Sequence, residues 1–202
     1  MVKKFCNLLQ LSYSNTKTHT MKKITFFTGV YIAFALVFML NSYSALAQGG
    51  TKLNDAEIAS AAVVANQSDI DFAMIAKQKS KNAEVLKFAE TMAKDHKAVI
   101  DQAVALVTKL KVTPKDNAVS QKLKSDAAKT QKMLRSKSAQ AFDKAYIDNE
   151  VAYHKAVIAA VETVLIPQAT NEELKGLLQN VVPALKAHLE HAEMVQKMFA
   201  SK

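Results

Sequence analysis

Three histidines and two acids lie where the sequence otherwise places apolar side chains. His96, His154 and His188 fall within segments whose apolar residues recur every three or four positions, and Asp69 and Glu150 occupy the same kind of position. Such spacing places all five side chains on the inward faces of helices. A buried imidazole needs a hydrogen bond or a metal ion, and imidazole with carboxylate binds Zn, Fe, Mn or Cu. These five residues therefore form a candidate metal site.

A structural network is the alternative interpretation of the same residues. The Glu-x-x-His signature of di-iron bundles is absent, because the residues three positions before His96, His154, His188 and His191 are Ala93, Val151, Leu185 and His188. Without a ligand motif, the sequence favours interhelical hydrogen-bonded pairs that fix the register of the helices, Asp69 with His96 and Glu150 with His188. This interpretation assigns no cofactor, and a transition metal is the alternative.

The chain carries no recognisable catalytic motif. Its single cysteine, Cys6, lies near the N-terminus, and the sequence has neither a Gly-x-Ser-x-Gly motif nor a glycine-rich phosphate loop. We therefore expect a non-enzymatic binding or structural module, related to stress, with a metal-binding protein as the rival hypothesis. The sequence identifies no partner.

The elements that must position these residues are helices. Only 4 Gly and 3 Pro in 202 residues leave few turns, and the apolar spacing of three and four is that of an amphipathic helix. We predict an all-α fold, a ferritin-like four-helix bundle with a short extra helix in its crossover. The expected long helices are 54–79, 83–110, 139–166 and 171–199, with the short helix around 119–134.

The depth of each residue along the bundle follows from the positions of the turns. Folding the chain back near residues 82–83 brings Asp69 level with His96, and folding it back near 168–169 brings His188 level with Glu150 and one turn from His154. We expect His96 and His188 to be buried, with Asp69 or Asp95 as the partner of the first and Glu150 as the partner of the second. His191 is expected to be exposed. Pro183 should bend the last helix.

The first 47 residues have the features of an export signal. They contain five of the 27 basic residues and none of the 18 acids, and the order from Met21 is a basic start, an uncharged stretch 24–40 and the small-residue pattern Ala45-Leu46-Ala47. We predict cleavage after Ala47, with an uncleaved anchor as the alternative and residues 1–20 as an upstream extension.

This signal places the rest of the chain outside the cytoplasm, in the periplasm or associated with the outer membrane, with residues 48–53 as a linker and 54–202 as the bundle. The part after residue 47 is only mildly basic. With export, this makes nucleic acid an unsuitable partner. Contact with a membrane is expected only through an uncleaved signal segment.

Three segments resemble a known family. "AEVLKFAETMAKDHKAV", "FDKAYIDNEVAYHKAV" and "VVPALKAHLEHAEMV" are similar to the exported bacterial domain-of-unknown-function 4142 family, over about residues 53–199. The resemblance implies a ferritin-like helical bundle with a signal peptide, sometimes labelled an outer membrane protein, and it implies no activity. The positions that match the family pattern are Asp69, Asp95, His96, His154, Pro183 and His188; Tyr153 departs from it, where the family often has an acid.

Overall fold

The computed structural model describes residues 52–200 of the chain, and this part is helical throughout, with turns but no strands. The elements are α3 (Asp55–Lys79), α4 (Ala83–Lys109), α5 (Ala118–Ser136), α6 (Ala139–Ala160), the π-helical turn η1 (Val161–Leu165), α7 (Ile166–Gln168) and α8 (Glu172–Ala200). The predicted all-α fold is confirmed. The predicted signal peptide and its cleavage site lie outside the described residues.

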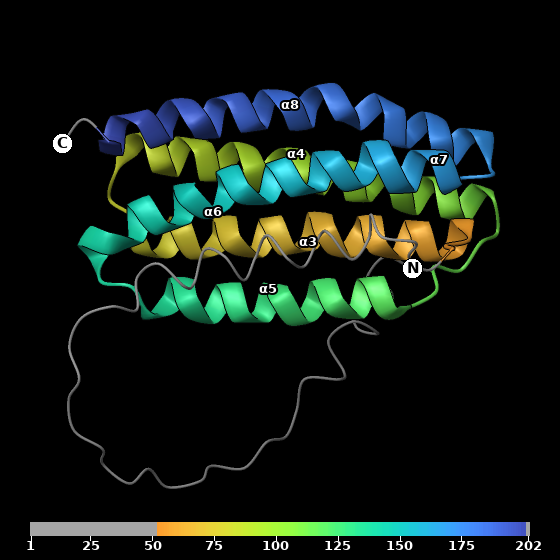
Figure 1. The fold of residues 1–202 in the computed structure, drawn as a ribbon, viewed down its shortest axis with the longest axis horizontal. Coiled ribbons are helices and arrows are strands. Elements are labelled where there is room, and N and C mark those ends of the chain that lie inside the picture. The colour runs from red at the N-terminus through yellow and green to blue at the C-terminus, as the bar shows by residue number, and fades with distance from the viewer. Residues whose placement is uncertain (1–51, 201–202) are drawn as a thin grey trace, which may run out of the picture. The chain divides into compact units, whose positions relative to one another are not determined.

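Four long helices form a bundle of two hairpins (Figure 1). α3 pairs with α4 and α6 pairs with α8, and the two hairpins pack through α3 against α6 and α4 against α8, so that neighbouring helices run antiparallel. α5 carries the chain across from the first hairpin to the second and packs along α3. Its length allows α4 and α6, which run in the same direction, to occupy opposite corners of the bundle.

Asparagine side chains cap the starts of α3, α4, α5 and α8. The side chain of Asn54 accepts a hydrogen bond from the backbone N–H of Glu57, whose carboxylate accepts one from the N–H of Asn54, which makes a capping box. Asn82, Asn117 and Asn171 accept hydrogen bonds from the first turns of α4, α5 and α8 in the same way. These local bonds satisfy N–H groups that have no partner inside the helix, and they explain why the predicted helix starts agree closely with the structure.

The third predicted helix ends differently from expectation. It was expected to stop at residue 166, before Pro167, but helical structure continues to Gln168 through the π-helical turn η1. Proline lacks an N–H and its ring collides with the carbonyl group one α-turn earlier. The wider π-helical turn directly before Pro167 provides room for this ring. Pro183 lies inside α8, which remains helical on both sides of it.

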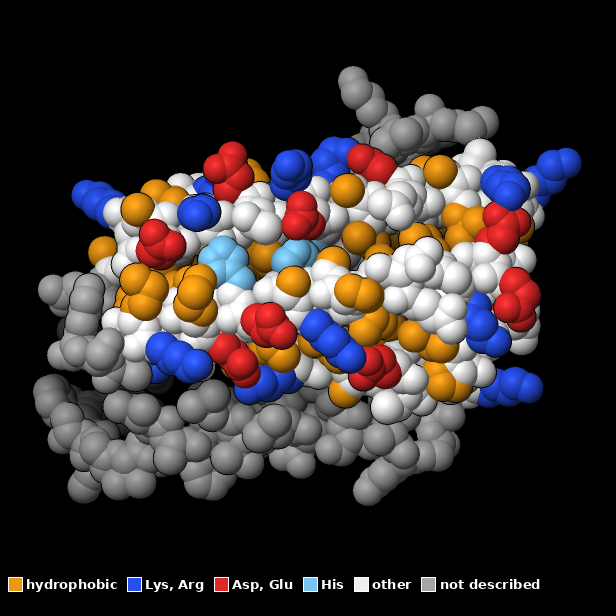
Figure 2. Space-filling model, turned by 90° about the horizontal axis from the view of Figure 1, so that it is seen from above, with side chains coloured by type: hydrophobic (Ala, Val, Ile, Leu, Met, Phe, Trp, Pro, Cys, Tyr) orange, Lys and Arg blue, Asp and Glu red, His pale blue; other side chains and the backbone are white. Residues whose placement is uncertain are grey.

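Charged side chains of both signs are interspersed over the face of the bundle that Figure 2 shows. No helix between residues 52 and 200 combines the length and the apolar character needed to span a membrane.

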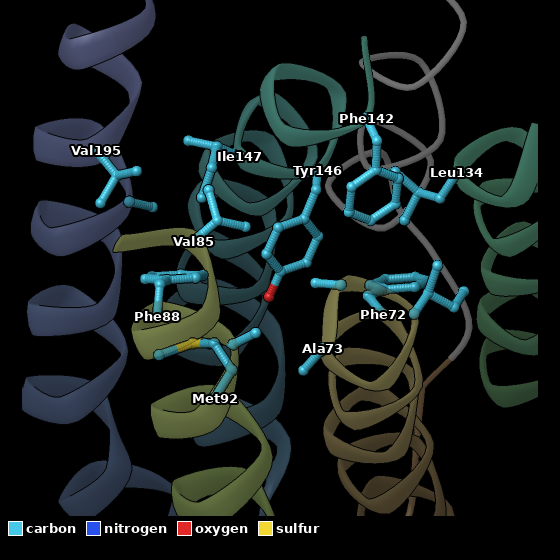
Figure 3. Packing of buried hydrophobic residues seen from close by; sticks show 14 of the residues in the cluster. Phe72, Ala73, Val85, Phe88, Met92, Leu134, Phe142, Tyr146, Ile147 and Val195 are labelled. Carbon is cyan, nitrogen blue, oxygen red and sulfur yellow. The ribbon is translucent and has the colours of Figure 1, made fainter. Parts of the chain in front are cut away.

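The interior contains two hydrophobic clusters. The first, here the aromatic core, is built around the fully buried Phe72, Phe88, Phe142 and Tyr146, and Tyr146 reaches from α6 into the space between α3 and α4 (Figure 3). The second, here the aliphatic core, contains Ile and Val residues with leucines of η1 and α8. Along their helices Asp69, His96, His154 and His188 fall between positions of the two cores, so a polar layer separates the cores.

Candidate metal site

Three imidazole rings meet in this polar layer, each from a different helix. His96 of α4, His154 of α6 and His188 of α8 are buried, and their ring centroids lie 5.3–5.7 Å apart. Each ring offers one nitrogen atom, and these three atoms lie within 4.8 Å of one another. The two hairpins therefore pack with their histidines at the same level of the bundle. With Asp69 and Glu150, these residues are named the histidine cluster below.

Hydrogen bonds fix the orientation of each ring. His96 Nδ1 donates to Asn66 Oδ1 over 2.8 Å, His154 Nδ1 donates to the carbonyl oxygen of Glu150 over 3.0 Å, and His188 Nε2 donates to Asp95 Oδ2 over 3.1 Å. The amide of Asn66 is itself oriented, because its Nδ2 donates to the Ala62 carbonyl. Since all three partners are acceptors, the N–H of each ring is used in a bond to a group other than the other two rings.

In each ring the nitrogen that makes no hydrogen bond carries a lone pair. His96 Nε2, His154 Nε2 and His188 Nδ1 are buried and have no hydrogen-bond partner within the described chain. An imidazole whose N–H is bonded outward and whose other nitrogen is free is in the state of a metal ligand. Three such rings converge here.

A buried carboxylate completes the arrangement. Asp69 on α3 is fully buried, and its Oδ2 lies 3.3 Å from His96 Nε2 and 3.6 Å from His154 Nε2. Glu150, also fully buried, lies on the other side of His154, with Oε2 3.7 Å from its Nδ1. Asp69, Glu150 and His154 offer a second set of ligand atoms within 4.8 Å of one another.

Burial controls the charges of this layer. Loss of hydration lowers the pKa of His96 to about 3, with the neighbouring His188 lowering it further, and burial likewise lowers the pKa of His154. Burial raises the pKa of Asp69, and burial with the nearby Asp69 raises that of Glu150 well above its usual range. At neutral pH both His96 and His154 are uncharged, so neither supplies a positive charge beside the acids.

The predicted pairing of the histidines is half right. Asp69 lies beside His96 and both His96 and His188 are buried, as expected, although the hydrogen bond of the His96 ring goes to Asn66. Glu150 as the partner of His188 was wrong, because His188 bonds to Asp95 on α4. The turn positions fix depth along the bundle, but they do not determine which neighbouring helix a side chain faces.

The predicted exposure of His191 was also wrong. This residue is half-buried, and its ring packs edge-on against Phe88 of α4 at 5.1 Å between centroids. α8 buries a face that is wider than the single stripe of apolar residues from which the prediction was made.

Sequence reasoning missed two polar residues of the site, Asn66 and Tyr146, and assigned a third, Asp95, to His96 instead of His188. Asn66 orients His96, Asp95 orients His188, and Tyr146 places a buried hydroxyl group with no partner among residues 52–200 one turn before Glu150. The available signal was helical spacing, since Asn66 precedes Asp69 by one turn and Tyr146 precedes Glu150 by one turn.

A cavity adjoins the histidine cluster. It has a volume of about 320 Å³ and lies inside the half of the bundle that holds the aliphatic core. Its wall is mainly Ala, Val and Leu, with small residues Ala59, Ala62 and Ala65 contributed by α3, and the three histidines and Asp69 form part of the same wall. The alanines of α3 were the sequence signal for this space, because small inward side chains leave room between helices.

Together, the fold and the site define an all-α bundle protein with a buried cluster of histidines and carboxylates. A family model described as "Domain of unknown function (DUF4142)" matches residues 41–195, and the chain belongs to this family. No curated protein and no solved structure matches the chain.

Proposed function

We propose that this chain is an exported helical-bundle protein that binds a transition-metal ion through His96, His154, His188 and Asp69. One observation carries the proposal: three buried imidazoles from different helices bring ligand atoms within 4.8 Å of one another, two of them beside Asp69, and one nitrogen of each ring has no hydrogen-bond partner in the described residues. The signal-like composition of residues 1–47 supports export, and the two hairpins joined by a crossover support a ferritin-like relationship.

The rival structural network fits the contacts less well. Six buried nitrogen and oxygen atoms of the histidine cluster find no hydrogen-bond partner between residues 52 and 200, namely Asp69 Oδ1 and Oδ2, His96 Nε2, Glu150 Oε2, His154 Nε2 and His188 Nδ1. A buried polar atom without a partner costs about 1–3 kcal/mol. A network that served only to hold the helices together would bond these atoms to one another, whereas a metal ion would satisfy several of them at once.

The donor set indicates the class of metal. Three imidazole nitrogens and one carboxylate oxygen suit Zn²⁺ and other first-row divalent ions. Two ligand atoms of a tetrahedral ion, each about 2.0–2.1 Å from it, are separated by roughly 3.3 Å. His96 Nε2 and Asp69 Oδ2 already have this separation, at 3.3 Å. The hydrogen bonds from Asn66, the Glu150 carbonyl and Asp95 would hold the ligands in place.

Metal titration of the purified protein, produced without a histidine tag, tests the proposal. We expect calorimetry with Zn²⁺, Mn²⁺, Fe²⁺ and Cu²⁺ to find one ion bound per chain for at least one metal, with a metal-dependent rise in melting temperature. The variants H96A and H188A should lose this binding. His191→Ala is the matched control, because His191 lies on the same face of α8 and outside the cluster.

The proposal fails if no metal binds stoichiometrically. It fails equally if H96A and H188A, shown by circular dichroism to be folded, bind metal as well as the unaltered protein does. In that event the histidine cluster is a structural feature of the bundle.

A further inference from the structure

The cavity and the histidine cluster form one continuous space. His96, His154, His188 and Asp69 belong to the cavity wall, whereas Glu150 does not. An ion held by these four residues would therefore be reached from the cavity. A ligand that entered from the cavity would be the fifth on this ion, an expansion from four-coordinate to five-coordinate that zinc sites can make.

The dimensions of the cavity indicate the shape of that ligand. The wall extends along α3 from Ala59 to Asp69 and along α8 from Leu174 to His188, which corresponds to roughly 15–20 Å at 1.5 Å per residue. Spread over this length, a volume of 320 Å³ gives a mean cross-section of about 16–21 Å². This is the width of one extended alkyl chain and is too narrow for a fused ring system.

The volume sets the size of the ligand. An apolar cavity of about 150 Å³ accommodates one benzene molecule, with six carbon atoms. The present cavity, at about 320 Å³, is twice as large and accommodates about twelve non-hydrogen atoms by the same measure. Apart from the end formed by the histidine cluster, its wall is mainly aliphatic, so one end suits a polar head and the remainder suits a hydrocarbon chain.

The cavity has an opening between α4 and α8. Four residues of its wall are exposed, Ala98 and Gln102 on α4 and Asn180 and Ala184 on α8. Figure 2 looks onto the bundle from the side of α8 and shows histidine side chains at the surface, with hydrophobic side chains in the hollow beside them. Short side chains at this opening leave a passage for a narrow molecule.

We propose that the cavity binds a medium-chain aliphatic carboxylate, with its chain along the bundle and its head group coordinated to the metal ion at the histidine cluster. This inference rests on the metal site proposed above. A carboxylate is chosen because its oxygen atoms bind the same divalent ions as imidazole, and because the neutral tail matches the aliphatic wall.

Calorimetry with straight-chain carboxylates tests the inference on the Zn²⁺-loaded protein and on the metal-free protein. From butanoate to decanoate we expect affinity for the loaded protein to rise about fourfold per methylene group, and to stop rising near twelve non-hydrogen atoms, where the cavity is full. Decanoate should bind the metal-free protein at least about tenfold more weakly. 1-Decanol, which has the same chain and a weaker metal ligand, should resemble decanoate binding to the metal-free protein.

Two variants separate ligand binding from metal binding. A184W should block the opening and weaken decanoate binding at least about tenfold, while Zn²⁺ binding persists. A187W is the matched control, since Ala187 is also exposed on α8 and does not belong to the cavity wall. A62F, which fills the cavity from α3, should shorten the longest chain that binds.

The outcomes distinguish the two proposals. If Zn²⁺ binds but decanoate does not, or if affinity is independent of chain length, of metal or of A184W, the carboxylate inference is overturned and the metal site stands. If no metal binds, both are overturned.

Discussion

Replacing Asp69 by asparagine distinguishes a metal site from a structural network. Asp69 is fully buried, and neither of its carboxylate oxygens has a hydrogen-bond donor within residues 52–200. Its nearest neighbours are the ring nitrogens of His96 and His154, at 3.3 and 3.6 Å, which carry lone pairs. An amide of the same shape has no charge and can donate its N–H to one of these nitrogens.

The D69N variant should therefore be more stable than the unaltered protein when metal is removed. Leaving a buried polar atom unpaired costs about 1–3 kcal/mol, and we expect a gain of this size, equivalent to roughly 2–12 °C in melting temperature for a chain of this length. The same variant should bind Zn²⁺ at least about tenfold more weakly, because it lacks the anionic ligand. A residue that lowers stability and raises metal affinity is under functional rather than structural constraint.

The gain should also depend on pH. Burial raises the pKa of Asp69 above its ordinary value of 3.8 in the folded protein, so the folded state holds this proton more tightly than the unfolded state. The contribution of Asp69 to the stability of the unaltered protein therefore decreases as pH rises above 3.8 and then through the pKa that Asp69 has in the folded state. D69N has no such group, and its advantage should be larger at pH 7 than at pH 4.

Unfolding followed by circular dichroism at 222 nm, in urea with a chelator present, measures these effects. The chain contains no Trp, so the helical signal replaces the usual fluorescence. D101N is the control, because Asp101 is an exposed partner of Lys97 on α4 and its change should stay within about 0.5 kcal/mol. A loss of about 1 kcal/mol or more in D69N would refute the reasoning, since it would show that the carboxylate stabilises the fold.

Three further changes follow from the same contacts. Asn66→Ala removes the acceptor that orients His96 and should lower Zn²⁺ affinity about 10–100-fold in calorimetry; unchanged affinity would show that the ring needs no such support. Tyr146→Phe removes a buried hydroxyl with no partner in the described part of the chain and should stabilise the protein by about 1 kcal/mol in urea unfolding, whereas destabilisation would reveal a bond to that hydroxyl. Burial lowers the pKa of His96 to about 3, so at this residue the unfolded state binds more protons between pH 6.5 and 3. The stability of the unaltered protein relative to an H96N variant should therefore fall by about 1.4 kcal/mol per pH unit on acidification through this range; a difference in urea midpoint that does not change with pH would contradict the buried neutral ring.

The sequence contained enough information to predict the helices. Asparagine caps such as Asn54 and Asn171 act within one turn of the chain, and the spacing of apolar residues specifies the buried face of a helix without reference to its neighbours. Depth could also be predicted, because an antiparallel hairpin places residues equally far from its turn at the same level. This is why Asp69 and His96 are found together.

Tertiary packing decided what the spacing of residues leaves open. The partner of His188 depends on how α8 is rotated towards α4, and this rotation places the ring beside Asp95 rather than Glu150. The ring nitrogens that stay free depend on bonds such as that from His96 to Asn66, which lies on a different helix. The cavity beside the histidine cluster arises only when alanines of α3 face the other helices. Local sequence specifies which side chains lie on each face of a helix. The contacts and the empty space between helices depend on the distances and rotations of the helices, and these are set by the packing of all the helices together.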